Sequence, residues 1–102
     1  MPSAYLIVEM KITDPARYER YMAAAPDAIA DYGGEYLVRG GRFDVLEGDW
    51  QPARIVMLRF PSMERARAFY EAAHYSAMRE LRAGATEYFN MILVEGVSAP
   101  VV

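Results

Sequence analysis

Cysteine is absent from this 102-residue chain, and histidine occurs once, as His74. Without cysteine the chain has no disulfide framework, no thiolate-ligated zinc site and no thiol nucleophile. A single histidine also excludes a metal site that takes several imidazoles from one chain. We therefore expect neither a bound metal nor a cofactor.

An excess of positive charge is also lacking, because 11 lysine and arginine residues are set against 14 aspartate and glutamate residues, for a net charge of −3. This balance supplies no strong basic field for nucleic acid, which is bound largely through phosphate neutralisation. No apolar run approaches the roughly 20 residues that span a bilayer, and residues 1–8 lack the basic region of a signal peptide. The sequence predicts a cytoplasmic protein with neither nucleic acid nor membrane as partner.

Hydrophobic residues, in contrast, make up 54% of the chain and include 7 methionines and 8 tyrosines. Ordinary domains contain about 45–50% apolar residues. A chain of this length builds one domain around one core. The excess therefore predicts a second apolar surface, used for a subunit interface or a ligand pocket.

Hydrophobic periodicity divides the chain into strands and helices. Apolar residues at steps of three and four predict a helix over 15–32, in which Pro26 cannot donate to the carbonyl of Met22 and should kink or break the helix. Gly33 and Gly34 are suited to end this helix, and Ser62 is suited to cap the next one. The other predicted elements are strands over 4–12, 35–39, 54–60 and 87–95, an extended stretch over 43–47 and a short helical piece over 75–81.

The predicted order is βαββαβ, which right-handed crossovers fold into a four-stranded antiparallel sheet with both helices on one face. The fold class is therefore α+β and ferredoxin-like, with one domain over residues 1–97 and a C-terminal tail over 98–102. Alternation along the strands separates a purely apolar set, suited to the helices, from a mixed set, suited to the open face. The apolar set is Leu6, Val8, Met10, Val56, Leu58, Phe60, Phe89, Met91 and Leu93; the mixed set includes Tyr5, Ile7, Met57 and Ile92 with Glu9, Arg59 and Asn90.

The open face carries more apolar surface than a monomer leaves in water. Two such faces packed together would form a homodimer and enclose a space lined by the mixed set. That space is either a small-molecule site or a filled dimer core. Glu9 and Arg59 lie on strands that this topology makes neighbours, so we expect them to pair.

Three motifs carry a resemblance to a known family. They are residues 32–41 (YGGEYLVRGG), 46–50 (LEGDW) and 60–66 (FPSMERA). Together they make the chain, from about Tyr5 to Val97, similar to the family called domain of unknown function 1330 (DUF1330). The resemblance implies a dimeric α/β barrel of ferredoxin-like halves, an architecture shared by cofactor-free monooxygenases, chlorite dismutase relatives and muconolactone isomerases. It implies no particular activity.

We predict any ligand pocket between the open sheet face and the loop over 48–52. Arg39, which ends a strand before two glycines, is the candidate anion holder, and Trp50 is the candidate lid or wall. Glu9, Arg59 and Asn90 face the same side and are candidates for further ligand contacts. Each has a structural alternative: an ion pair for the charged residues and a plug or dimer contact for the tryptophan.

Catalytic candidates are weak, because no two of them have the spacing of a dyad or triad. Tyr21 and Tyr75 could donate a hydrogen bond to a ligand, and His74 could act as a general base. Packing in the core and a solvated helix end are the structural alternatives. Two functions stay open: a cofactor-free enzyme or binder of a small apolar or aromatic ligand, and a non-catalytic dimerisation or regulatory module with a filled core.

Overall fold

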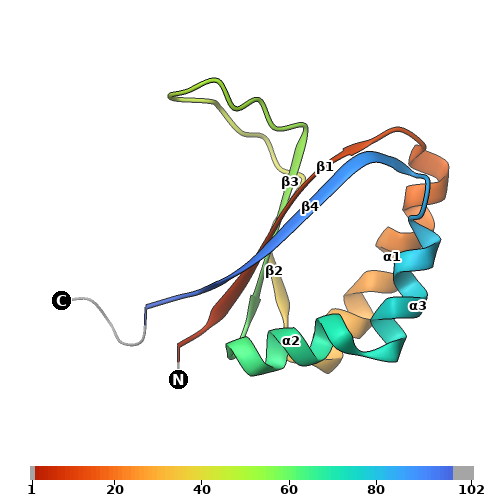
Figure 1. Cartoon of the computed structure of the whole chain (residues 1–102), viewed down its shortest axis with the longest axis vertical. Helices are drawn as coiled ribbons and strands as arrows, with labels where there is room; N and C mark the ends of the chain where they lie inside the picture. Colours follow the sequence, from red (N-terminus) through yellow and green to blue (C-terminus); the bar gives the residue numbers. More distant parts are fainter. Residues whose placement is uncertain (1, 98–102) are drawn as a thin grey trace.

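The computed structural model describes residues 2–97, so the tail predicted over 98–102 lies outside the described residues. Within this range the elements follow the predicted order, and the short helical piece expected over 75–81 is a helix that begins two residues earlier (Figure 1). The bounds are β1 (Ala4–Ile12), α1 (Pro15–Asp31), β2 (Glu35–Arg39), β3 (Arg54–Phe60), α2 (Met63–Glu71), α3 (Ala73–Leu81) and β4 (Thr86–Glu95).

The strands form one antiparallel sheet in the order β2-β3-β1-β4, and the helices lie on one of its faces (Figure 1). This confirms the predicted α+β, ferredoxin-like fold. The extended stretch expected over 43–47 is not part of the sheet. Gly40 and Gly48 take positive φ angles of 71° and 86°, which turn the chain out of the extended form. The 40–53 connection therefore projects from the sheet, away from the helices (Figure 1).

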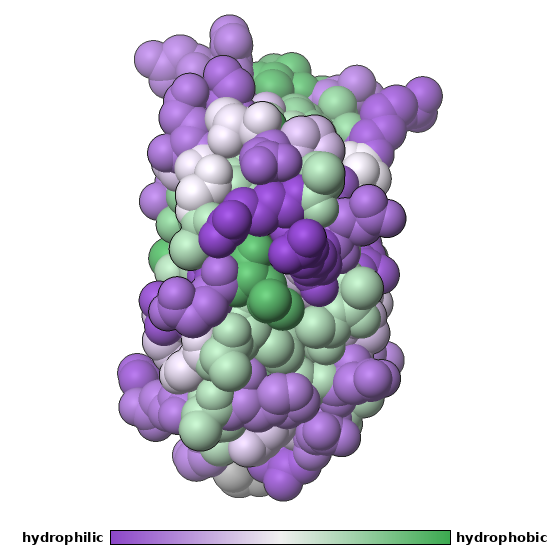
Figure 2. Space-filling model, turned by 90° about the vertical axis from the view of Figure 1, so that its right-hand side faces the viewer, coloured by the Kyte–Doolittle hydropathy of each residue, from purple (hydrophilic) through white to green (hydrophobic). Residues whose placement is uncertain are grey.

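The two sets of strand residues face the sides that their alternation predicted. Leu6, Val8 and Met10 are buried beneath the helices, each at most 3% exposed. On the open face, Ile92 and Val94 of β4 are 58% and 41% exposed. Figure 2 views the helix side directly and shows a small strongly hydrophobic patch near its centre, with strongly hydrophilic side chains above and beside it and weakly hydrophobic ones below.

Helix α1 is continuous through Pro26, so the expected break is wrong. Proline leaves the carbonyl four residues earlier without its helical donor. Here that carbonyl, on Met22, accepts a hydrogen bond of 2.8 Å from Nη2 of Arg39. The side chain of Arg39, on β2, thus supplies the hydrogen bond to the Met22 carbonyl that Pro26 cannot donate. The helix ends as predicted, with Gly33 in the left-handed region at a φ of 78°.

Aromatic rings from three elements pack the centre of the core. The ring of Phe69 in α2 lies with its centroid 5.2 Å from Phe60 of β3 and 4.5 Å from Tyr75 of α3. Each of these three side chains is at most 1% exposed. Ser62 caps α2 as predicted, its hydroxyl accepting from the backbone N–H of Arg65 at 3.2 Å. This packing fixes one wall of the site described next.

Candidate functional site

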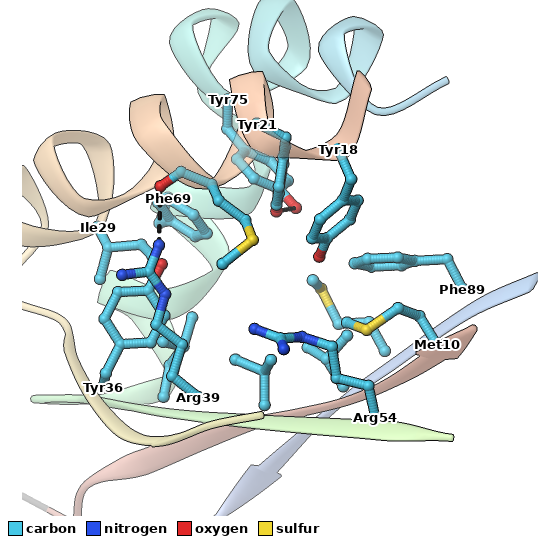
Figure 3. Close-up of a pocket in the computed structure, with 15 residues that line it drawn as sticks. Met10, Tyr18, Tyr21, Ile29, Tyr36, Arg39, Arg54, Phe69, Tyr75 and Phe89 are labelled. Atoms are coloured by element: carbon cyan, nitrogen blue, oxygen red, sulfur yellow. Dashed lines mark hydrogen bonds between the residues drawn. The ribbon is translucent and has the colours of Figure 1, made fainter. Parts of the chain in front are cut away.

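A cavity lies between the helices and the sheet, and we call it the helix-side cavity (Figure 3). It offers about 30 Å³ of space to a water-sized molecule, so a larger ligand is accommodated only when the side chains around it move. Its walls combine aromatic rings with flexible methionines, which can repack around a guest. No acidic residue of the described chain lines it. The aromatic residues are Tyr18, Tyr21, Tyr36, Phe69, Tyr75 and Phe89, the methionines are Met10, Met22 and Met91, and the charged residues are Arg39 and Arg54.

Tyrosine hydroxyls gather on the helical wall of this cavity. Tyr21 of α1 and Tyr75 of α3 share a buried hydrogen bond of 2.8 Å between their hydroxyl oxygens (Figure 3). Two hydroxyls carry two hydrogens and this bond uses one, so the other hydrogen is left for a further acceptor. Tyr18 adds a third hydroxyl, its ring centroid 5.4 Å from that of Tyr21. The wall is therefore a source of hydrogen-bond donors.

Burial keeps the hydroxyls of Tyr18, Tyr21 and Tyr36 protonated. Desolvation raises the pKa of Tyr18, Tyr21 and Tyr36 above the usual tyrosine value of about 10. The neighbouring Tyr75 raises the pKa of Tyr21 further, both by its charge when ionised and through their hydrogen bond. Arg54 acts in the opposite direction on Tyr18, because its positive charge favours the phenolate, but burial outweighs it. Near neutral pH the hydroxyls therefore donate hydrogen bonds.

Arg54 brings a positive charge to the opposite wall. It begins β3 in step with Val56 and Leu58, on the side of the sheet that faces the helices. Its Nε is buried and has no hydrogen-bond partner among the described residues. Leaving a buried donor unsatisfied costs about 1–3 kcal/mol. Figure 3 shows the guanidinium just above the sheet, extended across the cavity toward the side where Arg39 lies, with the tyrosines on the helices above it.

Gly40 makes room for this guanidinium. A Cβ built on Gly40 would lie 2.8 Å from Nη2 of Arg54 and closer still to Nη1 and Cζ. Gly41, in contrast, has open space around it, with no atom within 4 Å of such a Cβ. The absence of a side chain at Gly40 therefore lets Arg54 pass.

Arg39 lies at the same cavity because of an irregularity in β2. The register places Tyr36 opposite Leu58 but Val38 opposite Met57, so Leu37 is an extra residue between them. A bulge of this kind moves the following side chains to the other face. Arg39 is thereby aligned with Val56, on the helix side. Its guanidinium lies over the ring of Tyr36, 4.5 Å from the centroid, while donating to Met22.

Trp50 lies in a separate hollow formed largely by the 40–53 connection. This hollow offers about 350 Å³ of space to a water-sized molecule and is lined by residues including Phe43, Leu46, Trp50 and Ile55. Arg39 does not line it, so Arg39 and Trp50, predicted to share one pocket, lie at different hollows of the single chain. The reason is the bulge in β2, which turns Arg39 toward the helices. Trp50 itself is 61% exposed.

Two of the three polar candidates of the open face, Glu9 and Arg59, have partners other than those expected. The predicted pair of Glu9 and Arg59 is wrong, because the register sets Glu9 opposite Ile55 and Arg59 opposite Tyr5. Arg59 forms an ion pair with Glu35 across β2 and β3. Glu9 instead accepts hydrogen bonds from the hydroxyl of Tyr88 and, at 3.2 Å, from the backbone N–H of Ala53. Asn90 is exposed and lies opposite Glu9 on β4.

The weak catalytic candidates do not all lie at one site. Tyr21 and Tyr75 meet in the helix-side cavity, whereas His74 is exposed at the start of α3 and lines neither hollow. Sequence reasoning missed Arg54, although its position gave a signal: it is the one charged residue in step with the apolar, helix-facing residues of its strand.

No group of three metal-ligating side chains occurs within residues 2–97. Over the same range, no helix has the length and apolar character needed to cross a membrane.

Comparison with protein families places the whole described chain in one of them. The model of the family described as "Domain of unknown function (DUF1330)" matches residues 3–97. A comparison with curated proteins found no match.

Solved structures with the same arrangement were also found. The RPA0582 protein of unknown function from Rhodopseudomonas palustris has a TM-score of 0.76 and 14% identity, covering 96% of this chain and 85% of that one. A dimeric ferredoxin-like protein of unknown function from Thermobifida fusca has a TM-score of 0.62 and 13% identity, covering 92% and 91%. A "putative antibiotic biosynthesis monooxygenase" from Caulobacter crescentus has a TM-score of 0.61 and 14% identity, covering 95% and 92%. Identities this low bear on the fold alone.

Proposed function

The chain belongs to the DUF1330 family, and we propose that it takes up a small aromatic or apolar molecule in the helix-side cavity, as a binder or as a cofactor-free enzyme. One observation carries the proposal: mostly apolar, adaptable walls surround a few converging polar groups, which is the usual form of a small-molecule site. Tyr21, Tyr75 and Arg54 supply those polar groups, and Arg39 borders the same space. The monooxygenase name of one structural relative is compatible with this proposal, but 14% identity transfers no activity.

The proposal locates the ligand on the helix side of the sheet rather than between two open faces. Support comes from Glu9 and Arg59 of the open face, because Glu9 is already bound by Tyr88 and Arg59 by Glu35. Trp50 and the hollow beside it form a competing location on the open side, lined partly by Ile55. The adjacent residue, Val56, lines the helix-side cavity. Ile55 and Val56 are adjacent on β3 but line different hollows, so substituting them one at a time distinguishes the two locations.

The open face completes the proposal as the surface of a homodimer. Its β4 residues Ile92 and Val94 are 58% and 41% exposed and lie beside half-buried Ile7 and Met57. A contiguous exposed apolar patch of this kind marks an interaction surface. A dimeric relative with the same fold supports self-association. Light scattering should give twice the single-chain mass of 11.5 kDa at micromolar concentration. A mass of one chain would contradict this part of the proposal.

Two matched variants test where the ligand binds. Val56→Phe fills the helix-side cavity, and Ile55→Phe places the same phenyl ring on the opposite face of the same strand. Calorimetric titration with benzoate and benzamide is expected to show binding of at least one probe to the wild type and to Ile55→Phe. Val56→Phe should lose that binding while circular dichroism shows it folded.

Loss of binding in Ile55→Phe alone would move the site to the Trp50 hollow and refute the proposed location. Absence of binding of either probe to the wild type would refute the function as stated. The second function considered from the sequence, a dimerisation module without a ligand, would then account for the molecule better.

A further inference from the structure

We infer that the ligand of the helix-side cavity is a carboxylate with an aromatic body, and that the guanidinium of Arg54 holds its charged end. The inference rests on the proposed function and adds the class of ligand to it. No sequence motif pointed to Arg54, and its role follows from what surrounds it.

The first argument is the balance of charge. Arg54 and Arg39 both line the cavity, and no aspartate or glutamate of the described chain lines it with them. The chain as a whole is acidic, with a net charge of −3, so this local excess of positive charge runs against its average composition. A half-buried cation without a counter-ion is unfavourable unless an anion joins it. An anionic ligand would supply the missing charge.

The second argument is the supply of hydrogen-bond donors. Nε of Arg54 is buried and donates to no group in residues 2–97. The Tyr21–Tyr75 pair retains one hydroxyl hydrogen beyond the one that joins the two oxygens. Donors therefore converge on the cavity from the sheet and from the helices. A carboxylate offers acceptors only, and its two oxygens match the planar fork of a guanidinium.

Arg39 is less suited to this role, although it lies nearby. Its Nη2 donates to the carbonyl of Met22, which has no helical donor because residue 26 is proline. Its guanidinium also lies over the ring of Tyr36. If Arg39 bound a ligand instead, the Met22 carbonyl would be left unpaired. Nε of Arg54 can bind a ligand without breaking a hydrogen bond to any described residue.

The remaining walls define the body of the ligand. Phe69 and Phe89 present rings to the cavity, and Met10 and Met91 can rearrange around a flat guest. Aromatic rings pack favourably at an edge or offset against other rings. A benzene ring with one carboxylate therefore matches both the apolar walls and the cationic end.

The test compares benzoate with benzamide, which has nearly the same shape without the charge. Calorimetric titrations are run on the wild type, Arg54→Gln, Arg54→Met and the control Arg20→Gln. Arg20 is an exposed residue of α1 that does not line the cavity, so its replacement makes the same change in net charge. Urea denaturation of each variant shows whether it is folded.

We expect the wild type and Arg20→Gln to prefer benzoate by about tenfold or more, the range of a charge-assisted hydrogen bond. Both Arg54 variants should lose this preference while still binding benzamide. Equal binding of the two probes to the wild type would overturn the carboxylate inference and leave the cavity function intact. A preference that survives in both folded Arg54 variants would overturn the role of Arg54. If neither probe binds the wild type, the proposed function fails, and the inference fails with it.

Discussion

Replacing Gly40 by alanine is expected to change ligand binding much more than stability. Two effects are combined at this position. The φ of 71° is strained for any residue with a Cβ and costs about 1–2 kcal/mol. The new Cβ would also overlap Nη1 and Cζ of Arg54 and lie 2.8 Å from Nη2, where ordinary contacts begin at 3.4 Å, so the whole guanidinium must leave its position. Because an arginine side chain is flexible, it can move at little further cost in stability.

Gly48→Ala is the matched control for this perturbation. Gly48 lies in the same connection with a φ of 86°, and no atom lies within 4 Å of a Cβ built there. Both variants should therefore lose about 1–2 kcal/mol in urea denaturation. Only Gly40→Ala should weaken benzoate binding, by about tenfold, because hydrogen bonds depend steeply on geometry. In an Arg54→Met background this extra effect should disappear. Equal benzoate affinities for the two glycine variants would refute the reasoning that Gly40 positions Arg54.

Two further predictions concern the groups around the cavity. The pKa of Tyr21 is raised on folding, so its stabilising effect is complete below the unfolded value of about 10 and is lost as the pH rises above it. The urea midpoint should therefore fall between pH 8 and pH 11, and this fall should be smaller for Tyr21→Phe than for the wild type. An equal fall in the two proteins would contradict this. Arg39→Met should cost about 1 kcal/mol through the unpaired Met22 carbonyl. That cost should shrink in a Pro26→Ala background, where residue 26 regains an N–H donor, and an unchanged cost in the double-mutant cycle would show that the two positions are independent.

The fold was predictable because strand alternation and helix periodicity each repeat many times along this chain. Leu6, Val8 and Met10 are buried as a set, as their two-residue spacing predicted. The cap at Ser62 and the glycine end of α1 were also local signals, read from single residues. Such features depend on neighbours in the sequence and need no knowledge of the register between strands.

The site was less predictable because it depends on register and on one extra residue. Glu9 and Arg59 lie on paired strands, yet the antiparallel register separates them and gives each another partner. The bulge at Leu37 sends Arg39 to the helix side, and nothing in the residues around it marks that position as a bulge. Both errors came from knowing which strands pair without knowing which residues stand opposite each other.

The continuity of α1 shows the same limit. Proline inside a helix predicts a break from local chemistry alone. The bond that satisfies Met22 comes from Arg39, a residue 17 positions away along the chain. Arg54 was the one site residue that the sequence could have revealed, because a charge in step with Val56, Leu58 and Phe60 is a charge facing the core side.

The central claim is that the helix-side cavity holds the ligand, and methionine methyl NMR tests it most directly. Met10, Met22 and Met91 line the cavity, whereas Met57 lies on the open face of the same sheet. With ¹³C-methyl methionine, saturating benzoate is predicted to shift the signals of the three cavity methionines through the ring current of the bound probe and to leave Met57 unchanged. Shifts confined to Met57, or no saturable shift at any of the four, would contradict the claim.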